Sequence, residues 1–168
     1  MDKLYAPWRS IYIAQATGHR QHLQGCVFCA SFDDGESFAE RFILYKNEHL
    51  IILLNLYPYN AGHLLIVPAQ HVGQLDGIAP EVNNALMQAI VQSTAIVQQA
   101  LGCAGVNIGM NLGLASGAGI PDHLHWHVVP RFAGDINFFA VIGNTKQISV
   151  DLSSIYKTLK PYFDKATL

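Results

Sequence analysis

The stretch IPDHLHWHVVPR, from Ile120 to Arg131, carries a histidine at every second position, namely His123, His125 and His127. Side chains alternate between the two faces of a β-strand, so in a strand these imidazoles share one face, with neighbours roughly 6.5 Å apart. The apolar residues between them then share the other face, which we expect to be the core face. The spacing therefore predicts a strand with one apolar side and a row of three histidines on the opposite side.

The chemistry of imidazole gives the histidine row three readings. A polar strand that faces solvent is the simplest, but histidine is an uncommon residue for that purpose alone. Two histidines at positions i and i+2 of a strand can also bind one metal ion as a pair. In the third reading a neutral imidazole attacks phosphorus while its neighbours orient the phosphate oxygens. The row by itself leaves a metal site and a catalytic site open.

A glycine-rich loop precedes the histidines. The segment NLGLASGAGIPD, residues 111–122, contains Gly113, Gly117 and Gly119 and is longer than the roughly two to five residues of a hairpin loop. Small residues let backbone N–H groups approach and point at an anion, so we expect a phosphate-binding loop. Asp122 is the only acid between residues 111 and 131, whereas magnesium needs carboxylates near the phosphates. The sequence therefore predicts no magnesium requirement and assigns charge stabilisation to imidazoles and backbone amides.

Strand and helix patterns surround this loop. From Pro80 to Leu101 apolar residues recur at near-helical spacing, with Gly102 suited to the position after the helix. A shorter apolar pattern predicts a C-terminal helix that ends near Pro161. β-branched, aromatic and leucine residues, with a hairpin turn at Asn47-Glu48, predict strands at residues 41–46, 49–55, 63–68, 105–111 and 123–130. The order of elements predicts an α+β fold, in which an antiparallel sheet of about five strands packs with one long central helix and a short C-terminal helix.

Composition narrows the class of protein. The chain has 168 residues, of which 51% are hydrophobic and 13% charged, with a net charge of −2. It fits a single domain over residues 1–168 and has no basic tract for nucleic acid. No apolar run is long enough to cross a bilayer, and the N-terminus lacks the apolar core of a signal peptide. We therefore expect a cytoplasmic protein that binds neither nucleic acid nor a membrane.

Several segments resemble one known family. The heptad from His123 to Val129 resembles the signature His-φ-His-φ-His-φ-φ, where φ is apolar, of the histidine triad (HIT) superfamily of nucleotide hydrolases and transferases. NLYPYNAGHLLIVPAQH, residues 55–71, is similar to the family's Asn-containing strand and the Gly-His strand after it, and MNLG, residues 110–113, is similar to its polar strand. The resemblance covers about residues 26–131, which we take as the core of the domain. Two further segments, YAPWRSIYI at residues 5–13 and AGIPDHLHWHVVPRFAGDINF at residues 118–138, resemble the diadenosine tetraphosphate phosphorylase branch.

The resemblance implies a two-step reaction at an α-phosphate. His125 would be the nucleophile that forms a nucleotidyl-imidazole intermediate, and His127 would contact the α-phosphate and the bridging oxygen. His63 would support the site from behind, although a core histidine is an equal reading. The nucleotide-binding residues that the resemblance implies are Asn55 for the ribose, Asn111 for phosphate or the bridging atom, and the loop residues Gly117, Ala118 and Gly119.

The resemblance also gives candidates for the molecule that accepts the nucleotidyl group and implies which oligomer the protein forms. In the phosphorylase branch inorganic phosphate resolves the intermediate, so diadenosine tetraphosphate gives ADP and ATP. In hydrolase branches water does so and gives AMP, and the sequence leaves the acceptor open. Family members usually pair through the central helix and an adjacent strand, which implies a homodimer. A nucleotide-binding module without useful turnover is a rival reading, because residue types alone do not exclude it.

The pair Cys26 and Cys29 has three readings: a redox pair, half of a metal site, or two buried thiols. A redox pair should open a helix of a thioredoxin-like βαβ unit, and that context is absent. An odd count of three cysteines argues against a disulfide framework. Some triad-family members complete a zinc site with a histidine after the Gly-His strand and with the first triad histidine, which correspond here to His71 and His123. The resemblance therefore implies a structural zinc ion held by Cys26, Cys29, His71 and His123.

The chain departs from its relatives at two places. Several hydrolase branches carry Gln or Ser a few residues before the triad, where this chain has Ala118-Gly119-Ile120-Pro121, which disfavours the animal-type triphosphate hydrolases. The phosphorylase branch usually has Trp after Pro-Arg, where this chain has Phe132, a change that keeps an aromatic surface but alters the base stacking.

Overall fold

The computed structural model describes residues 25–32, 37–135, 142, 148 and 150–168, and the segment YAPWRSIYI lies outside them. One antiparallel sheet has the strand order β1-β2-β3-β5-β4. Its strands are β1 (Ile43–Lys46), β2 (Leu50–Leu54), β3 (Leu64–Pro68), β4 (Gly105–Gly109) and β5 (Trp126–Arg131). The long helix α2 (Pro80–Leu101) and the C-terminal helix α4 (Leu152–Phe163) complete the α+β fold predicted from the sequence. None of the described helices is both long and apolar enough for a membrane span.

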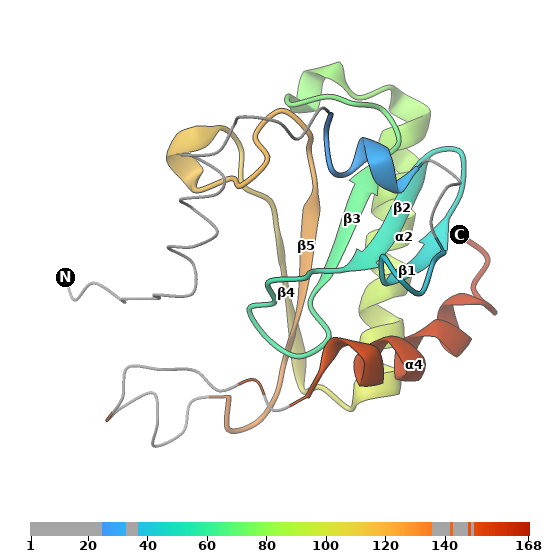
Figure 1. Cartoon of the computed structure of the whole chain (residues 1–168), viewed down its shortest axis with the longest axis vertical. Helices are drawn as coiled ribbons and strands as arrows, with labels where there is room; N and C mark the ends of the chain where they lie inside the picture. The colour runs from blue at the N-terminus through green and yellow to red at the C-terminus, as the bar shows by residue number, and fades with distance from the viewer. Residues whose placement is uncertain (1–24, 33–36, 136–141, 143–147, 149) are drawn as a thin grey trace.

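The helices cover one face of the sheet. Figure 1 shows α2 running behind the strands, with α4 across the end of the sheet near β1. The main hydrophobic core lies between these layers and contains alternate residues of the strands, such as Ile52, Ile66 and Val128, together with Leu86 and Leu159 from the helices. Burial of these side chains supplies the principal stabilisation of the fold.

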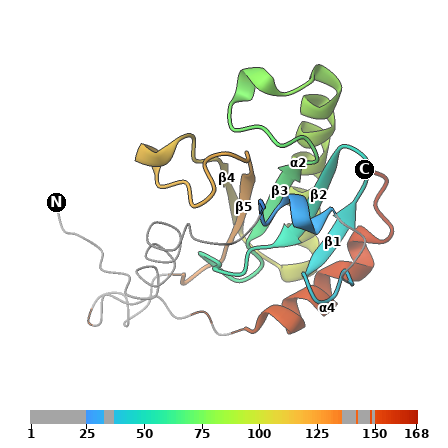
Figure 2. The ribbon, with the colours of Figure 1, turned by 45° about the horizontal axis from the view of Figure 1, so that its top comes forward.

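The opposite face of the sheet is also covered. In the β1–β2–β3–β5 register, Ile43, Leu53, Leu65 and His127 lie side by side on this face. A second hydrophobic cluster forms there with Phe28, which belongs to the segment before the short 3-10 helix η1 (Cys29–Ser31). Figures 1 and 2 place this segment over β2 and β3, on the side away from α2. The histidine face is therefore an interior face, and the expectation of a core on one side only was wrong.

The chain near the histidines differs from the predicted strand. Strand β5 begins at Trp126, so His123 and His125 precede it, and only His127 lies within the strand. The ladder with β3 begins at the pair Ile66 and Trp126, and before it the N–H of Leu124 donates to the carbonyl of Val72 at 2.7 Å. The chain between the first two histidines is thus bound, through Leu124, to the segment after β3 instead of to its ladder.

The two helices are close to their predicted bounds. Helix α2 runs from Pro80 to Leu101 as predicted and ends in Gly102, whose φ of 63° favours glycine. Helix α4 ends at Phe163, two residues past Pro161, near which its end was predicted. Buried Leu159 and Phe163 flank the proline and hold this last turn against the core.

Candidate active site and metal site

A chain of hydrogen bonds defines the proton positions on His63 and His127. The backbone N–H of Tyr59 donates to Nδ1 of His63 at 3.0 Å, so this nitrogen must accept and the neutral ring carries its proton on Nε2. That Nε2–H then donates to Nδ1 of His127 at 2.9 Å. Nδ1 of His127 is therefore an acceptor, and Nε2 of His127 carries the proton. His127 can thus donate a hydrogen bond through Nε2.

His63 is held neutral by its surroundings. Burial, followed by the neighbouring rings of His127 and His125, lowers the pKa of His63 to about 3. The side-chain amide of Asn55 lies 3.3 Å from the same Nδ1 that accepts from Tyr59. The tyrosine ring itself packs on both imidazoles, 4.6 Å from His63 and 5.6 Å from His127 between centroids.

The ring of His125 has the opposite proton arrangement. Its Nδ1 lies 2.9 Å from the backbone carbonyl of His123, which can only accept, so Nδ1 carries the proton and Nε2 carries the lone pair. Burial lowers the pKa of His125 and outweighs this hydrogen bond, which raises it. The lowered pKa favours the neutral ring at neutral pH. The rings of His125 and His127 are 5.1 Å apart. The pair therefore combines a nucleophilic nitrogen with a neighbouring N–H donor, as attack on an electrophile such as phosphorus requires.

The segment from Cys26 to Ser31 covers part of this site. The ring of Phe28 packs 5.0 Å from His125 and 5.5 Å from His123. His125 keeps only 7% of its surface exposed and His127 only 9%. The approach to His125 is therefore narrower than the open strand face expected from the sequence.

The predicted metal ligands come together. One ligand atom from each of Cys26, Cys29, His71 and His123 lies within 4.8 Å of the others. Nδ1 of His123 lies 3.3 Å from Sγ of Cys26 and 3.6 Å from Sγ of Cys29, and Nδ1 of His71 lies 3.1 Å from Sγ of Cys29. Tetrahedral zinc with its usual bond lengths separates sulfur and nitrogen ligands by roughly 3.6 Å. These four side chains could therefore hold a metal ion.

The orientation of His123 fits the same role. Its Nε2 lies 2.9 Å from the carbonyl of Pro68 and must donate to it, which leaves the lone pair on Nδ1, toward the two thiols. Metal-binding histidines usually donate their second nitrogen to a carbonyl or carboxylate in this way. Burial is the main cause that lowers the pKa of His123, so the ring is neutral, as a ligand must be.

Of the remaining predicted residues, Asn55 contacts His63, and the others belong to the connection between β4 and β5. The oxygen of the Asn55 side chain accepts from the N–H of Tyr57 at 2.9 Å, so both ends of this amide contact its own loop. Gly117 has a φ of 85°, and its N–H donates to Leu114 inside the 3-10 turn η3 (Leu114–Ser116). Ala118 is buried at the end of this turn, and Gly119 and half-buried Asn111 belong to the same long connection between β4 and β5.

Two aromatic residues beside the imidazoles were not foreseen, and a third aromatic residue packs against the core. Phe28 and Tyr59 pack on the imidazoles. In the sequence, Phe28 was marked only by its position between the two cysteines, and Tyr59 only by its position in the turn before Gly62. Phe132, at the position where the sequence analysis placed an aromatic surface, is half-buried and packs against the main core between the sheet and the helices.

Comparisons with known proteins agree with this geometry. A family model described as HIT domain matches residues 37–134. The chain is 32% identical over 150 residues to AP-4-A phosphorylase of Mycobacterium tuberculosis, which covers 88% of this chain and 77% of that protein. An uncharacterized HIT-like protein of Methanocaldococcus jannaschii is 33% identical over 135 residues, 80% of this chain and 98% of that one.

A solved structure extends the likeness to three dimensions. The crystal structure of a Zn-bound histidine triad family protein from Mycobacterium smegmatis has a TM-score of 0.68 and 25% sequence identity, and it covers 84% of this chain and 94% of that one. The matched model and the relatives together establish that the chain belongs to the HIT family and is an enzyme of that family.

Proposed function

We propose that the protein transfers a nucleotidyl group from a dinucleoside polyphosphate by way of a covalent intermediate on His125, and that it acts as a diadenosine tetraphosphate phosphorylase. The observation that carries this proposal is the pair of ring orientations. Nδ1 of His125 is bound to a backbone carbonyl, which leaves its Nε2 lone pair available, and the neighbouring His127 carries a proton on Nε2. Attack and stabilisation of a phosphate oxygen need one nitrogen of each kind.

The reaction proceeds in two displacements. Nε2 of His125 attacks the α-phosphorus, an N–P bond forms, and the bond from this phosphorus to the bridging oxygen breaks to release ATP. His127 donates a hydrogen bond from Nε2 to the bridging oxygen as charge develops there. Inorganic phosphate then attacks the same phosphorus, the N–P bond breaks, and ADP leaves with the neutral imidazole restored.

Phosphate as acceptor is favoured by two likenesses. A relative with 32% identity over most of this chain bears the name AP-4-A phosphorylase. Residues 118–138 also resemble that branch, and the positions before the triad lack the Gln or Ser of several hydrolase branches.

The surrounding residues would bind the nucleotide. Asn55 would exchange its contacts within the loop for the ribose hydroxyls, and Asn111 would bind phosphate or the bridging oxygen. The amides of Ala118 and Gly119, and that of Gly117 after a change in the 3-10 turn, would bind phosphate oxygens.

We also propose that Cys26, Cys29, His71 and His123 hold a structural zinc ion. The proposal is supported by four ligand atoms, two from thiols and two from imidazoles, that lie within 4.8 Å of one another. Four such ligands would complete a closed tetrahedral site, with no position left for a substrate. The ion would fix the segment that carries Phe28 over the first two histidines, and His123 would then do no phosphate chemistry.

A homodimer is the assembly that we propose, with the chain as a single domain in the cytoplasm. Strand β4 is an edge of the sheet, and its Ile108 is 47% exposed on the helix side. Helix α2 exposes Met87 and Val91, which are one turn apart. A second copy paired along β4 would cover an open edge and exposed apolar side chains.

Product analysis tests the proposed reaction. Purified protein is given diadenosine tetraphosphate with and without inorganic phosphate, and the nucleotides are separated by chromatography. We expect ADP and ATP, and only when phosphate is present. AMP and ATP regardless of phosphate would assign a hydrolase, and no cleavage of any adenylyl substrate would refute the enzymatic proposal for this site.

A further inference from the structure

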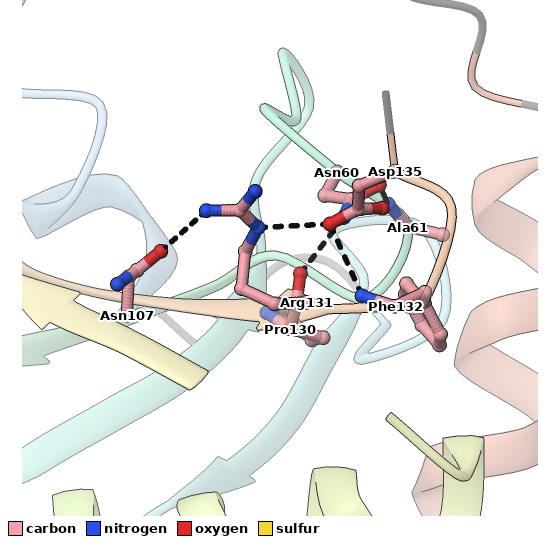
Figure 3. A network of polar contacts seen from close by, with 7 residues as sticks. All are labelled: Asn60, Ala61, Asn107, Pro130, Arg131, Phe132 and Asp135. Carbon is pink, nitrogen blue, oxygen red and sulfur yellow. Dashed lines mark hydrogen bonds and ion pairs between the residues drawn. The ribbon is translucent and has the colours of Figure 1, made fainter. Parts of the chain in front are cut away.

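A buried asparagine joins the loop behind the histidines to the end of strand β5. Asn60 lies in the β2–β3 loop and is 5% exposed. Its Nδ2 donates to the carbonyl of Pro130 at 2.8 Å and to Oδ1 of Asp135 at 2.9 Å, and its Oδ1 accepts from the N–H of Ala61 at 3.1 Å. Figure 3 shows this amide between the loop and the turn after β5. Both N–H bonds of the Asn60 side-chain amide and its oxygen are thus engaged in hydrogen bonds, which fixes the orientation of the amide.

The partners of Asn60 are themselves fixed. Oδ2 of Asp135 accepts from Nε of Arg131 at 2.8 Å and from the N–H of Phe132 at 3.1 Å. Arg131 also donates from Nη1 to the side chain of Asn107 in β4 at 2.8 Å (Figure 3). The network therefore reaches from β4 through β5 to the β2–β3 loop.

The residues on either side of Asn60 hold His63. The carbonyl of Asn60 accepts from the N–H of His63 at 3.2 Å, and the N–H of Tyr59 donates to Nδ1 of His63. The Tyr59 ring is stacked on His127 with an interplanar angle of 21°. A shift of this loop would alter the bond that fixes the proton position on His63, and through it the proton position on His127.

We propose that Asn60 is a positioning residue of the reaction, which acts by tying the Tyr59–His63 part of the loop to Pro130 and Asp135. In its absence the Tyr59 N–H no longer holds Nδ1 of His63 as an acceptor, and only the longer 3.3 Å contact from the Asn55 amide remains at this nitrogen. His63 can then donate from either nitrogen. His127 then also populates the form with its lone pair on Nε2, which repels a phosphate oxygen instead of donating to it. This inference rests on the proposed function, because the donor on His127 matters through the bridging oxygen.

Replacement of Asn60 by Ala tests the inference in kinetics. We expect kcat for diadenosine tetraphosphate to fall by roughly 10- to 100-fold, as for a small misplacement of a catalytic group, while KM changes little because the donor acts mainly in the transition state. Asn47→Ala is the matched control: its Oδ1 also holds a turn, by accepting from the N–H groups of His49 and Leu50, but in the β1–β2 connection. This control should keep the wild-type kcat.

Two further measurements complete the test. A second variant guards against a folding defect of Asn60→Ala, and a spectroscopic measurement does not depend on turnover. Asp135→Ala removes one partner of Asn60 from the less buried end of the network and should lower kcat in the same direction. In spectra of ¹⁵N-labelled imidazoles, Nε2 of His127 should be protonated in the wild type and in Asn47→Ala, and only partly so in Asn60→Ala. Loss of kcat no greater than in Asn47→Ala, or an unchanged His127 proton position in Asn60→Ala, would overturn the inference. Failure of the wild type to cleave the substrate would instead refute the proposed function and leave the spectra to decide on Asn60.

Discussion

Single hydrogen bonds decide the chemistry of each histidine. Backbone carbonyls at His123 and Pro68 fix the protons of His125 and His123, and the backbone N–H of Tyr59 fixes those of His63 and His127. The alternating pattern predicted which residue types would meet, but the partners are backbone groups on other segments. For that reason the histidine pattern alone left the triad open between metal and catalysis, and the family resemblance divided it. The structure has the same grouping, since His123 lies with the cysteines and the rings of His125 and His127 are neighbours.

The depressed pKa of His63 makes a prediction at this scale. The folded ring has a pKa of about 3, below the unfolded value near 6.5, so the unfolded chain binds one more proton between these limits. The stabilising contribution is therefore full above pH 6.5 and is lost as the pH falls toward 3, at about 1.4 kcal/mol per pH unit. We expect this slope to be missing in His63→Gln, which keeps an N–H donor but does not titrate.

Urea unfolding at several pH values between 7.5 and 4.5 measures this effect. The free energy of unfolding of His63→Gln should be lower than that of the wild type at pH 7.5, and the difference should shrink as the pH falls. Because both proteins contain all the other titratable groups, the difference isolates His63. Parallel curves for the two proteins would contradict a neutral buried His63.

At the scale of elements, periodicity in the sequence predicted the helices and strands, but not the contacts between distant segments. Helix α2 has its predicted bounds because a regular apolar stripe, Pro80 and Gly102 all point to the same segment. Strand β5 starts late because Leu124 pairs with Val72 outside the strand ladder, a contact that no local pattern announces. The second core face was missed because it is completed by Phe28 from a distant segment. The sequence therefore placed the histidines on the face opposite the core, whereas they are buried.

The proposed metal site predicts how loss of one ligand changes the zinc content and the stability of the protein. In Cys26→Ser we expect the zinc content to fall well below one ion per chain, because one of four ligands is lost. The melting temperature should fall as well, since a structural ion contributes folding energy. Cys103→Ala is the matched control, because Cys103 is a buried free cysteine of the main core and should leave the zinc content unchanged. Elemental analysis of the two purified variants measures their zinc content, and thermal unfolding measures the melting temperature. Full zinc content in Cys26→Ser would exclude this ligand set.

At the scale of the whole molecule, the two faces of the sheet have separate tasks. The helix face carries the large core, and the other face carries the histidines under a small cluster and a short covering segment. Residues of the proposed active site come from the β2–β3 loop, the connection before β5 and β5 itself, so the sheet brings together positions more than 60 residues apart, such as His63 and His127. The order of strands and helices was predictable from sequence, whereas this assembly required the strand register.

Strand β4, an edge of the sheet that the structure describes, gives the prediction for assembly. A charge at Ile108 in β4 would be buried between two copies, so Ile108→Glu should convert the proposed homodimer to a monomer. Val150→Glu places the same charge at an exposed apolar residue before α4 and should leave the dimer intact. Sedimentation velocity separates the two states. A wild-type protein that sediments as a monomer at all concentrations, or a dimeric Ile108→Glu, would contradict this interface.

The central claim is that Nε2 of His125 forms a bond to the α-phosphorus. The most direct measurement is to mix the protein with diadenosine tetraphosphate labelled at the α-phosphates, without inorganic phosphate, quench it in alkaline denaturant and map the label by peptide mass spectrometry. We predict an adenylyl group on the peptide at His125 in the wild type and in His127→Gln, and none in His125→Ala. Products formed by a wild type that never carries the label, or equal labelling of His125→Ala, would contradict the account.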